Sequence, residues 1–482
     1  MRPSSITLLG ALALSLSAQA VETLRIDLQH GGDADSEHYA LERVVVEALP
    51  WAGNPERSID DTDRGTHRFE VFDSSGERLL YSRGFSTIFG EWRSTDEASR
   101  LSRSFQESMR LPMPRQPVLL RVSARAADGA FVPLWSAALD PASTDIERVP
   151  ARAPAQPLLI HGDGETAHRV DLLMLGDGYA AHELAKFEAD ARRLSAHLFG
   201  ISPFKERAQD FNVWALTVPV PESGVSRPST GLHRASATGL RYDIFGSERY
   251  ALSVDNRAWR ELAQYAPYDA VEIIFNSETY GGGGIFGQFS TAAAGSDWAS
   301  YLFVHEFGHH FAGLADEYYT SAVAYAGPTG RPEPWEPNAT ANTDRATLKW
   351  KHLLPDGAEL PSAWPKSEFE RFQRENQKRR SELRAQRRPE AEMSALFGDE
   401  QAFVDGLFDP HPNRNVVGAF EGANYEATGY YRPQMQCLMF TRHDAFCSVC
   451  REAIEQIIDL YSAGKSESVS APPPRPASPS GP

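Results

Sequence analysis

Cysteine is scarce in this chain, with only three residues among 482, near the end of the sequence. A disulfide-rich scaffold is therefore excluded, and the fold has to depend on a hydrophobic core. Cys437, Cys447 and Cys450 allow one disulfide with one thiol left over, and the sequence does not choose among the three possible pairings. The Cys447-x-x-Cys450 spacing also suits half a metal site or a redox pair, although no second Cys/His pair of suitable spacing accompanies it.

Positive charge and long apolar runs are also lacking. Lys and Arg number 48 against 65 Asp and Glu, which gives a formal net charge of −17. Such an acidic chain is poorly suited to nucleic acid, so no nucleic-acid partner is expected. A membrane helix needs about 20 apolar residues in a row. The sequence contains no such run, so no membrane span is expected either.

The first twenty residues have the pattern of a secretory signal. Arg2 supplies the positive start, residues 6–16 form a short apolar run, and residues 18–20 (Ala-Gln-Ala) form a small-x-small cleavage site. The mature chain is then expected to begin at Val21. The protein is expected to be exported and to be periplasmic or secreted.

Two folded parts are expected in the mature chain. Residues 21–145 contain short alternating strands, including two hairpins at 69–81 and 118–135, and this pattern predicts a β-sandwich-like domain. Residues 146–165 are the expected linker. The Ser/Pro/Ala-rich residues 466–482 are an expected disordered tail.

Residues 166–465 follow a different pattern. Apolar runs at 170–175, 211–218 and 270–275 predict buried strands, and the spacing over 182–199 predicts a helix. Strands that alternate with helices indicate an α/β layer, so the fold class expected for the whole chain is α+β or α/β.

The second part contains the sequence HEFGHHFAGLADE at residues 305–317. On a helix, His305 and His309 lie one turn apart on the same face and can bind one metal ion. Glu306 lies beside them and can act as general base on a metal-bound water. Gly313 can end the helix in a left-handed turn. The His-Glu-x-x-His spacing is typical of zinc peptidases.

The candidates for a third metal ligand are the acidic residues that follow the motif in the sequence. Zinc peptidases use three protein ligands and leave one position for water. If the helix ends near Gly313, the chain can turn back beneath the metal and bring Asp316 to it, with Glu317 as the alternative. In the usual metzincin spacing, glycine and histidine lie three and six residues after the second histidine. Here Gly313 and Asp316 lie four and seven residues after His309. A ligand on a second helix is disfavoured because prolines at 332, 334 and 337 surround the next acids.

Further site candidates come from neighbouring segments. Gly282 and Gly283, in the glycine run before the motif, are expected at the rim of the cleft, where an edge strand pairs with an extended substrate. Tyr430 and Tyr431 are candidate donors to the oxyanion of a tetrahedral intermediate. For each tyrosine, ordinary core packing is the alternative.

Two other features concern the later part of the chain. Metzincins carry a methionine turn beneath the metal, and Met439 or Met435 is the candidate, with ordinary core packing as the alternative. The highly charged residues 365–389 predict a solvated helix or surface insertion, with a grip on acidic substrate as the other interpretation.

Several short sequence motifs, which follow one another along the chain, resemble those of peptidase family M64, the IgA-peptidase-like zinc metallopeptidases. They are VDLLMLGDGY at 170–179, ESGVSRP at 222–228, FGSERY at 245–250, YGGGG at 280–284, HEFGHHFAGLADEYY at 305–319, EPWEPN at 333–338, and YRP at 431–433 followed by CLM at 437–439 and the Cys-x-x-Cys pair. The resemblance covers most of residues 166–460. Residues 21–140 are similar to the β-rich domain that precedes the enzyme in this family.

The resemblance implies a zincin, metzincin-like catalytic domain and a secreted zinc-dependent endopeptidase with one Zn²⁺ per chain. Carried onto this chain, it implies zinc on His305, His309 and Asp316, with Glu306 as the catalytic residue. The implied substrate is a protein or peptide of unknown identity, because the immunoglobulin A specificity in the family's name is not carried over.

The mechanism expected from the site is hydrolysis by a zinc-bound water, with Glu306 taking its proton and passing it to the leaving amine. Two alternatives remain open. One is a catalytically inactive secreted binding protein, against which the intact His305, Glu306 and His309 count. The other is a zinc amidase acting on cell-wall amides.

Overall fold

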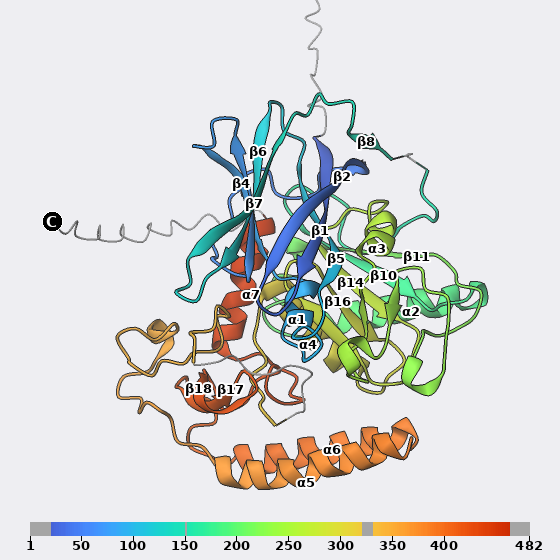
Figure 1. Cartoon of the computed structure of the whole chain (residues 1–482). Coiled ribbons are helices and arrows are strands. Elements are labelled where there is room, and N and C mark those ends of the chain that lie inside the picture. Colours follow the sequence, from blue (N-terminus) through green and yellow to red (C-terminus); the bar gives the residue numbers. More distant parts are fainter. Residues whose placement is uncertain (1–20, 150–151, 321–330, 463–482) are drawn as a thin grey trace, which may run out of the picture.

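The computed structural model describes residues 21–149, 152–320 and 331–462. The predicted signal peptide (1–20) and the predicted tail (466–482) lie outside the described residues. Figure 1 shows a strand-rich N-terminal part, coloured blue to cyan, which packs against a mixed part that contains the later helices. Within the described ranges, no helix combines the length and the apolar character needed to cross a membrane.

Two four-stranded sheets form the N-terminal part. Their strand orders are β5-β1-β2-β8 and β4-β3-β6-β7. All neighbours are antiparallel except β2 and β8. The bounds are β1 Glu22–Gly32, β2 Glu37–Pro50, β3 His67–Asp73, β4 Leu79–Phe85, β5 Arg103–Pro112, β6 Val118–Arg125, β7 Phe131–Leu139 and β8 Glu147–Arg148, with the short helix α1 Ile88–Arg93 after β4. The two hairpins predicted at 69–81 and 118–135 are β3–β4 and β6–β7, so both are confirmed.

The central strand β1 has two buried faces of different character. Successive side chains of a strand point to opposite sides of its sheet. Leu24, Ile26 and Leu28 face the apolar core that the two sheets share, whereas Arg25 and Asp27 lie on the opposite face and are also buried. The sandwich therefore has one side of its first sheet available for polar contact with the rest of the chain.

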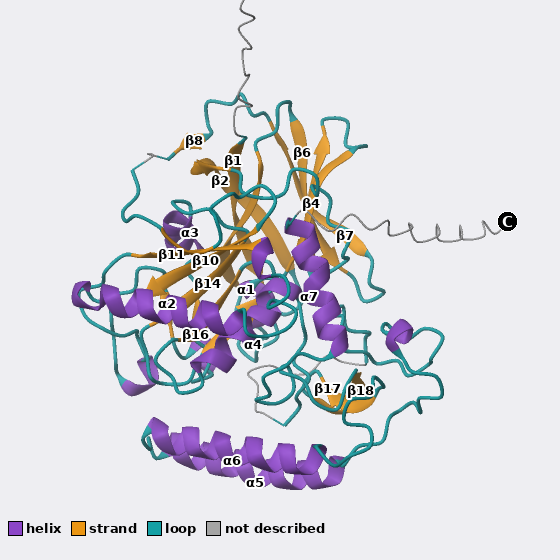
Figure 2. Cartoon of the chain, turned by 180° about the vertical axis from the view of Figure 1, so that it is seen from behind, coloured by secondary structure: helices purple, strands orange, loops and turns teal. Residues whose placement is uncertain are grey.

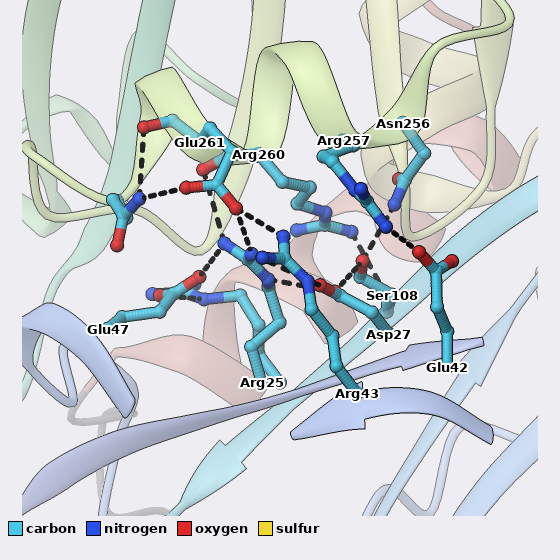
Figure 3. A network of polar contacts seen from close by, with 12 residues as sticks. Arg25, Asp27, Glu42, Arg43, Glu47, Ser108, Asn256, Arg257, Arg260 and Glu261 are labelled. Carbon is cyan, nitrogen blue, oxygen red and sulfur yellow. Dashed lines mark hydrogen bonds and ion pairs between the residues drawn. The ribbon is translucent and has the colours of Figure 1, made fainter. Parts of the chain in front are cut away.

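Those polar residues meet helix α3 (Asn256–Ala263) of the second part, as Figure 3 shows. Arg25 donates hydrogen bonds of 2.8 Å to Asp27 and 2.8 Å to Glu261. Arg43 also pairs with both carboxylates. Removing one partner from a buried ion network is costly, because it leaves an uncompensated charge. The network therefore fixes how the N-terminal part sits on α3.

A six-stranded sheet forms the centre of the second part, in the order β15-β16-β14-β10-β11-β9. The four inner strands are parallel, and the two edge strands β15 and β9 are antiparallel to their neighbours. The bounds are β9 Leu158–His161, β10 Val170–Asp177, β11 Phe211–Thr217, β14 Ala270–Phe275, β15 Gly282–Ile285 and β16 Phe289–Ala293. The three predicted strands are confirmed as β10, β11 and β14. The fold is thus mixed α/β, with a strand-rich N-terminal domain.

Helices pack against this sheet and also contact one another. Helix α4 (Ala299–Ala312) packs against β15 and β16 and also contacts α2 (Leu184–Leu198) and α7 (Ser448–Tyr461). The helix predicted at 182–199 is α2, which a short 3-10 turn precedes. The remaining short elements are 3-10 turns at Ala181–Glu183, Ala208–Asp210, Pro228–Thr230, Ile244–Gly246 and Lys351–Leu353, and the strand pair β12 Leu240–Arg241 and β13 Leu252–Ser253.

The predicted linker, 146–165, contains two edge strands. Strand β8 joins the first N-terminal sheet, and β9 pairs with β11 of the central sheet. Both strands are short, which explains why the Pro- and Ala-containing sequence gave no strand signal.

A helical hairpin and a strand hairpin complete the chain. Helices α5 (Lys366–Ala385) and α6 (Glu390–Phe408) lie side by side at one end of the molecule in Figures 1 and 2, with the rings of Phe372 and Phe403 stacked 3.9 Å apart. The charged helix predicted within 365–389 is α5. Strands β17 Phe420–Ala423 and β18 Glu426–Arg432 form the second hairpin.

Candidate metal centre and cleft

Helix α4 carries the three motif residues His305, Glu306 and His309. It ends at Gly313, which has a left-handed φ of 60°. A Cβ atom at Gly313 would lie 2.7 Å from the ring of Trp335. Glycine is therefore needed for the turn and for the close approach, and the chain can reverse immediately after the motif.

Three ligand atoms converge after this reversal. His305 Nε2 lies 3.2 Å from His309 Nε2, and Asp316 Oδ1 lies 3.1 and 3.2 Å from these two nitrogens. Ligands about 2.0–2.1 Å from a tetrahedral zinc ion are separated by about 3.3 Å, so the spacing fits zinc. Asp316 Oδ1 is also buried without a hydrogen bond from any described residue. The donor set and its geometry therefore fit the metal that the motif predicts.

Backbone carbonyls orient both imidazoles. His309 Nδ1 lies 2.6 Å from the carbonyl oxygen of Leu314, and His305 Nδ1 lies 3.2 Å from that of Leu438. A ring nitrogen that faces a carbonyl oxygen carries the proton, which leaves the lone pair on Nε2. The outer contacts thus direct the metal-binding nitrogen of each ring toward Asp316.

The electrostatics of these groups favour positive charge between them. Burial alone would raise the pKa of Asp316, but His309 and His305 hold that pKa well below its usual range. Burial likewise opposes the charged form of His309, yet Asp316 raises the pKa of His309 to about 9. A proton or a metal cation between the rings and the carboxylate is therefore stabilised.

Tyr425 supports Asp316 from an uncommon turn. Asn424 and Tyr425 have φ values of 52° and 63° and form the two-residue turn between β17 and β18. The Tyr425 hydroxyl donates to Asp316 Oδ2, and Asn424 N–H donates to the Asp316 carbonyl at 2.9 Å. A left-handed tyrosine is unfavourable, and here it persists where it contacts a candidate ligand.

Glu317, the alternative third ligand, points elsewhere. Its N–H donates to the carbonyl oxygen of Met439 at 2.9 Å, and its carboxylate lies 3.3 Å from Cys450 Sγ. Asp316, not Glu317, accompanies the two histidines. The structure has all three cysteines as free thiols, so the predicted disulfide is not present among them.

The predicted methionine turn lies against the motif helix. A Cβ atom on Gly308 would lie 3.1 Å from Met439 Sδ. Of the two candidates, Met439 packs under α4, while the carbonyl of Met435 accepts a hydrogen bond from Arg432. The turn at Met439 therefore supports the helix beneath the candidate metal centre.

A cleft opens above the three ligands. Segments far apart in the sequence line it, namely α1 with Glu91, β15 with Gly282 and Gly284, the α5–α6 hairpin with Gln373, Arg380 and Glu400, and the loops that carry Arg249, Tyr318, Tyr425 and Arg442. Glu306 also lines the cleft, and burial raises the pKa of its carboxyl. An acid of raised pKa beside a metal centre suits proton transfer.

Edge strand β15 approaches α4 closely because it consists mainly of glycine. A Cβ atom on Gly284 would lie 2.5 Å from the Glu306 carbonyl oxygen and 2.9 Å from His309 Cβ. The prediction that Gly282 lies at the cleft is consistent with the lining residues. For Gly283 it was wrong, because a Cβ there would meet Leu252, on the other face of the strand. Residues alternate along a strand, so Gly284 replaces Gly283 at the cleft.

The predicted oxyanion donors, Tyr430 and Tyr431, do not line the cleft. Tyr430 donates its hydroxyl hydrogen bond to the carbonyl of Pro332, and Tyr431 is paired through its backbone with Thr340. Tyr318 lines the cleft instead, with its hydroxyl 3.4 Å from the Arg249 guanidinium.

Glu91, in the N-terminal domain, is a cleft residue that sequence reasoning missed. Burial raises its pKa to about 7, although the Tyr250 hydroxyl donates to it at 3.2 Å. No local signal marks Glu91, because only the packing of α1 against the second part brings it to the cleft.

Two protein-family models match most of the chain. A family model described as IgA Peptidase M64 matches residues 158–458, and one described as Peptidase M64 N-terminus matches residues 17–136. No curated protein matches the chain. Among solved structures, a crystal structure of a polysaccharide deacetylase from Bacillus cereus is 10% identical, with a TM-score of 0.09. The match covers 50% of this chain and only 57% of that one, and at this TM-score it carries no argument.

Proposed function

The chain belongs to the IgA Peptidase M64 family and is therefore a peptidase, and from that premise we propose that it is an exported, zinc-dependent endopeptidase. The observation that carries the zinc proposal is the convergence of His305 Nε2, His309 Nε2 and Asp316 Oδ1 at mutual distances of 3.1–3.2 Å. These are nitrogen and oxygen ligands at zinc spacing, and three protein ligands are typical of a catalytic zinc site.

The metal ligands, Glu306 and Tyr318 each have a different role in the proposed hydrolysis. His305, His309 and Asp316 would hold a zinc ion, which would supply Lewis acidity toward the scissile carbonyl and lower the pKa of a water molecule. Glu306 accepts the proton of the attacking water and delivers it to the leaving nitrogen. Tyr318, whose hydroxyl accepts from Arg249, is the candidate donor to the developing oxyanion.

Strand β15 provides the docking edge for substrate. It is the last strand on its side of the central sheet, and Tyr250 bridges Gly282 on its outer edge, so among the described strands the edge from Gly283 to Ile285 pairs with β16 alone. An extended peptide can add to such an edge through main-chain hydrogen bonds. The absence of side chains at Gly282 and Gly284 brings that peptide close to α4. The substrate class proposed is accordingly an extended segment of a protein or peptide.

Export is the second component of the proposal. Strand β1 begins at Glu22, one residue after Val21, where the mature chain is proposed to start. N-terminal sequencing of the protein from periplasmic and culture fractions tests this component. A chain that retains Met1 in the cytoplasm would contradict export and leave the peptidase proposal untouched.

Glu306→Gln tests the mechanism. The variant is expected to fold and to retain zinc, since none of the three ligands changes, but to lose about 10²–10⁴-fold in kcat, the usual contribution of a general base. Glu188→Gln, on α2 with its side chain 46% exposed and paired only with the neighbouring Arg192 among the described ion pairs, is the matched control. Activity is measured on a panel of unfolded proteins, with and without a chelator and with zinc added back.

Either of two results would contradict this proposal. Near-normal turnover by Glu306→Gln would exclude Glu306 as the base. Hydrolysis that resists complete removal of metal would exclude zinc dependence.

A further inference from the structure

Four buried ligating side chains meet on the opposite side of the Asp316 loop from the histidines. They are Cys437, Cys447, Cys450 and Glu317, and each is at most 3% exposed to solvent. One ligand atom from each residue lies within 4.8 Å of all the others. The mechanism above uses none of the four, and the sequence alone left the cysteines open between a disulfide, half a metal site and a redox pair.

The distances within this cluster match a tetrahedral zinc site. Cys437 Sγ lies 3.8 Å from Cys450 Sγ. Two thiolates bound at about 2.3 Å to tetrahedral zinc are separated by about 3.8 Å. Glu317 Oε1 lies 3.3 Å from Cys450 Sγ and 3.8 Å from Cys447 Sγ. A thiolate and a carboxylate oxygen on the same zinc ion are separated by about 3.5 Å.

The polar contacts of Glu317 favour a cation at this cluster. Its side chain is fully buried, and Oε1 accepts a hydrogen bond of 2.9 Å from Asn338. Oε2 is buried with no hydrogen bond from any residue in the described ranges. A buried carboxylate beside three sulfur atoms is costly unless a positive charge compensates for it.

The backbone is arranged to support thiolates. Cys447 caps the N-terminus of α7, and Cys450 N–H points to Cys447 Sγ at 3.4 Å. Cys447 N–H points in turn to Cys437 Sγ at 3.2 Å. Peptide N–H groups and the positive end of a helix both stabilise a thiolate. The buried Arg432 interacts electrostatically with Glu317 and Cys437, which offsets the excess negative charge of the cluster.

A disulfide accounts for less of this arrangement. It brings two sulfur atoms to about 2.05 Å. One cysteine would be left unpaired, and the buried Glu317 carboxylate would have no ligand role beside the neutral sulfur atoms. Three cysteines, two of them in C-x-x-C spacing, and one further ligand give the four-coordinate set of a closed structural zinc site, with the Glu317 oxygen in the place that Cys or His usually takes.

We propose that Cys437, Cys447, Cys450 and Glu317 bind a second zinc ion, which has a structural role. The site joins three segments that shape the candidate catalytic centre. Glu317 directly follows Asp316 and bonds to the Met439 carbonyl at 2.9 Å. Cys437 directly precedes Leu438, whose carbonyl orients His305. The bound ion thus holds the Asp316 loop, the methionine turn and the start of α7 in one arrangement.

The test is zinc content combined with X-ray absorption at the zinc edge. Wild-type protein, prepared without reductant or chelator, is expected to contain two zinc ions per chain. The double variant His305→Ala/His309→Ala is expected to retain one, with sulfur neighbours at about 2.3 Å. Cys447→Ser/Cys450→Ser is expected to lose that sulfur signal, and Ser448→Ala is the matched control on the same helix end.

Several outcomes overturn the second site. Only nitrogen and oxygen neighbours around zinc in the wild type would do so, as would an intact mass that is lower by one pair of hydrogens, which indicates a disulfide. The histidine double variant decides the question if the cysteine variant does not fold. Wild-type protein that contains sulfur-bound zinc but hydrolyses no protein substrate would contradict the catalytic proposal alone, so the two failures can be distinguished.

Discussion

Asp316 and Glu317 are neighbours in the chain, but their carboxylates lie in different clusters. Asp316 Oδ1 lies 3.1 Å from His305 Nε2 and 3.2 Å from His309 Nε2. Glu317 Oε1 lies 3.3 Å from Cys450 Sγ. One loop thereby supplies an acid to each of two ligand sets, and substitutions of these adjacent residues have separable consequences.

Asp316→Ala is expected to remove the catalytic zinc. It takes away one of the three ligands. Loss of a residue that only hydrogen-bonds to a ligand lowers metal affinity by up to about 100-fold, so the loss of a ligand itself should lower zinc affinity at the histidine pair by more than that. Turnover should fall with it. Zinc per chain after dialysis and kcat/KM on an unfolded protein substrate are the two measurements.

Glu317→Gln is the matched variant one residue later. It keeps the shape of the side chain and leaves His305, His309 and Asp316 intact, so the histidine-bound zinc should remain and turnover should fall by at most about 10–100-fold, the range for loss of a supporting contact. If Glu317→Gln lost the catalytic metal while Asp316→Ala kept it, the assignment of the two acids would be reversed.

Gly284→Ala is expected to impair both stability and activity. The new Cβ would lie 2.5 Å from the Glu306 carbonyl oxygen and 2.9 Å from His309 Cβ, and neither atom can move without moving α4. Overpacking of this kind costs about 1–3 kcal/mol. The free energy of unfolding, zinc content and kcat/KM measure the effect.

Gly283→Ala is the control on the same strand. Its Cβ would lie 2.8 Å from the end of the Leu252 side chain, which can change rotamer. Activity should therefore be reduced less than in Gly284→Ala. Equal losses of activity in the two variants would show that β15 tolerates no side chain on either face, and the close approach to α4 would not be the reason.

The helix that carries the candidate metal ligands could be predicted because its signals are local. His305 and His309 are four residues apart, which fixes their common face on any helix, and Gly313 marks the point where a helix can end. Buried strands β10, β11 and β14 could be predicted for the same reason, since each is a short and nearly continuous apolar run.

The rest of the site depends on packing between distant segments. Tyr425 reaches Asp316 from a turn 109 residues later, and Glu91 reaches the cleft from the other domain. Tyr430 and Tyr431 were candidate oxyanion donors because of their residue type. Where their side chains lie depends on the packing of β18, which the sequence does not show. The choice between Asp316 and Glu317 was open because the backbone of one loop sets the direction of both carboxylates.

His310, beside the motif, gives the chain a defined dependence of stability on pH. It is buried and accepts a hydrogen bond of 3.2 Å from Val271 N–H at Nε2, while Nδ1 lies 3.3 Å from the carbonyl oxygen of Ile285. Both contacts require the neutral ring, because protonation of Nε2 would remove the acceptor. Burial lowers the pKa of His310 to about 3, from 6.5.

The sign of the effect follows from this depressed pKa. Between pH 6.5 and about 3, the unfolded chain binds a proton at His310 and the folded chain does not, so the stability contributed by the neutral ring is lost as the pH falls through this window. The slope approaches about 1.4 kcal/mol per pH unit.

In metal-free protein, His310→Gln should lower the slope of unfolding free energy against pH between pH 4.5 and 6 by that amount, whatever its effect at pH 7. Guanidinium unfolding at each pH measures it, with His352→Gln at an exposed histidine as control. Parallel curves for wild type and His310→Gln would show that His310 is protonated equally in both states, and hence that its contact with Val271 is not maintained.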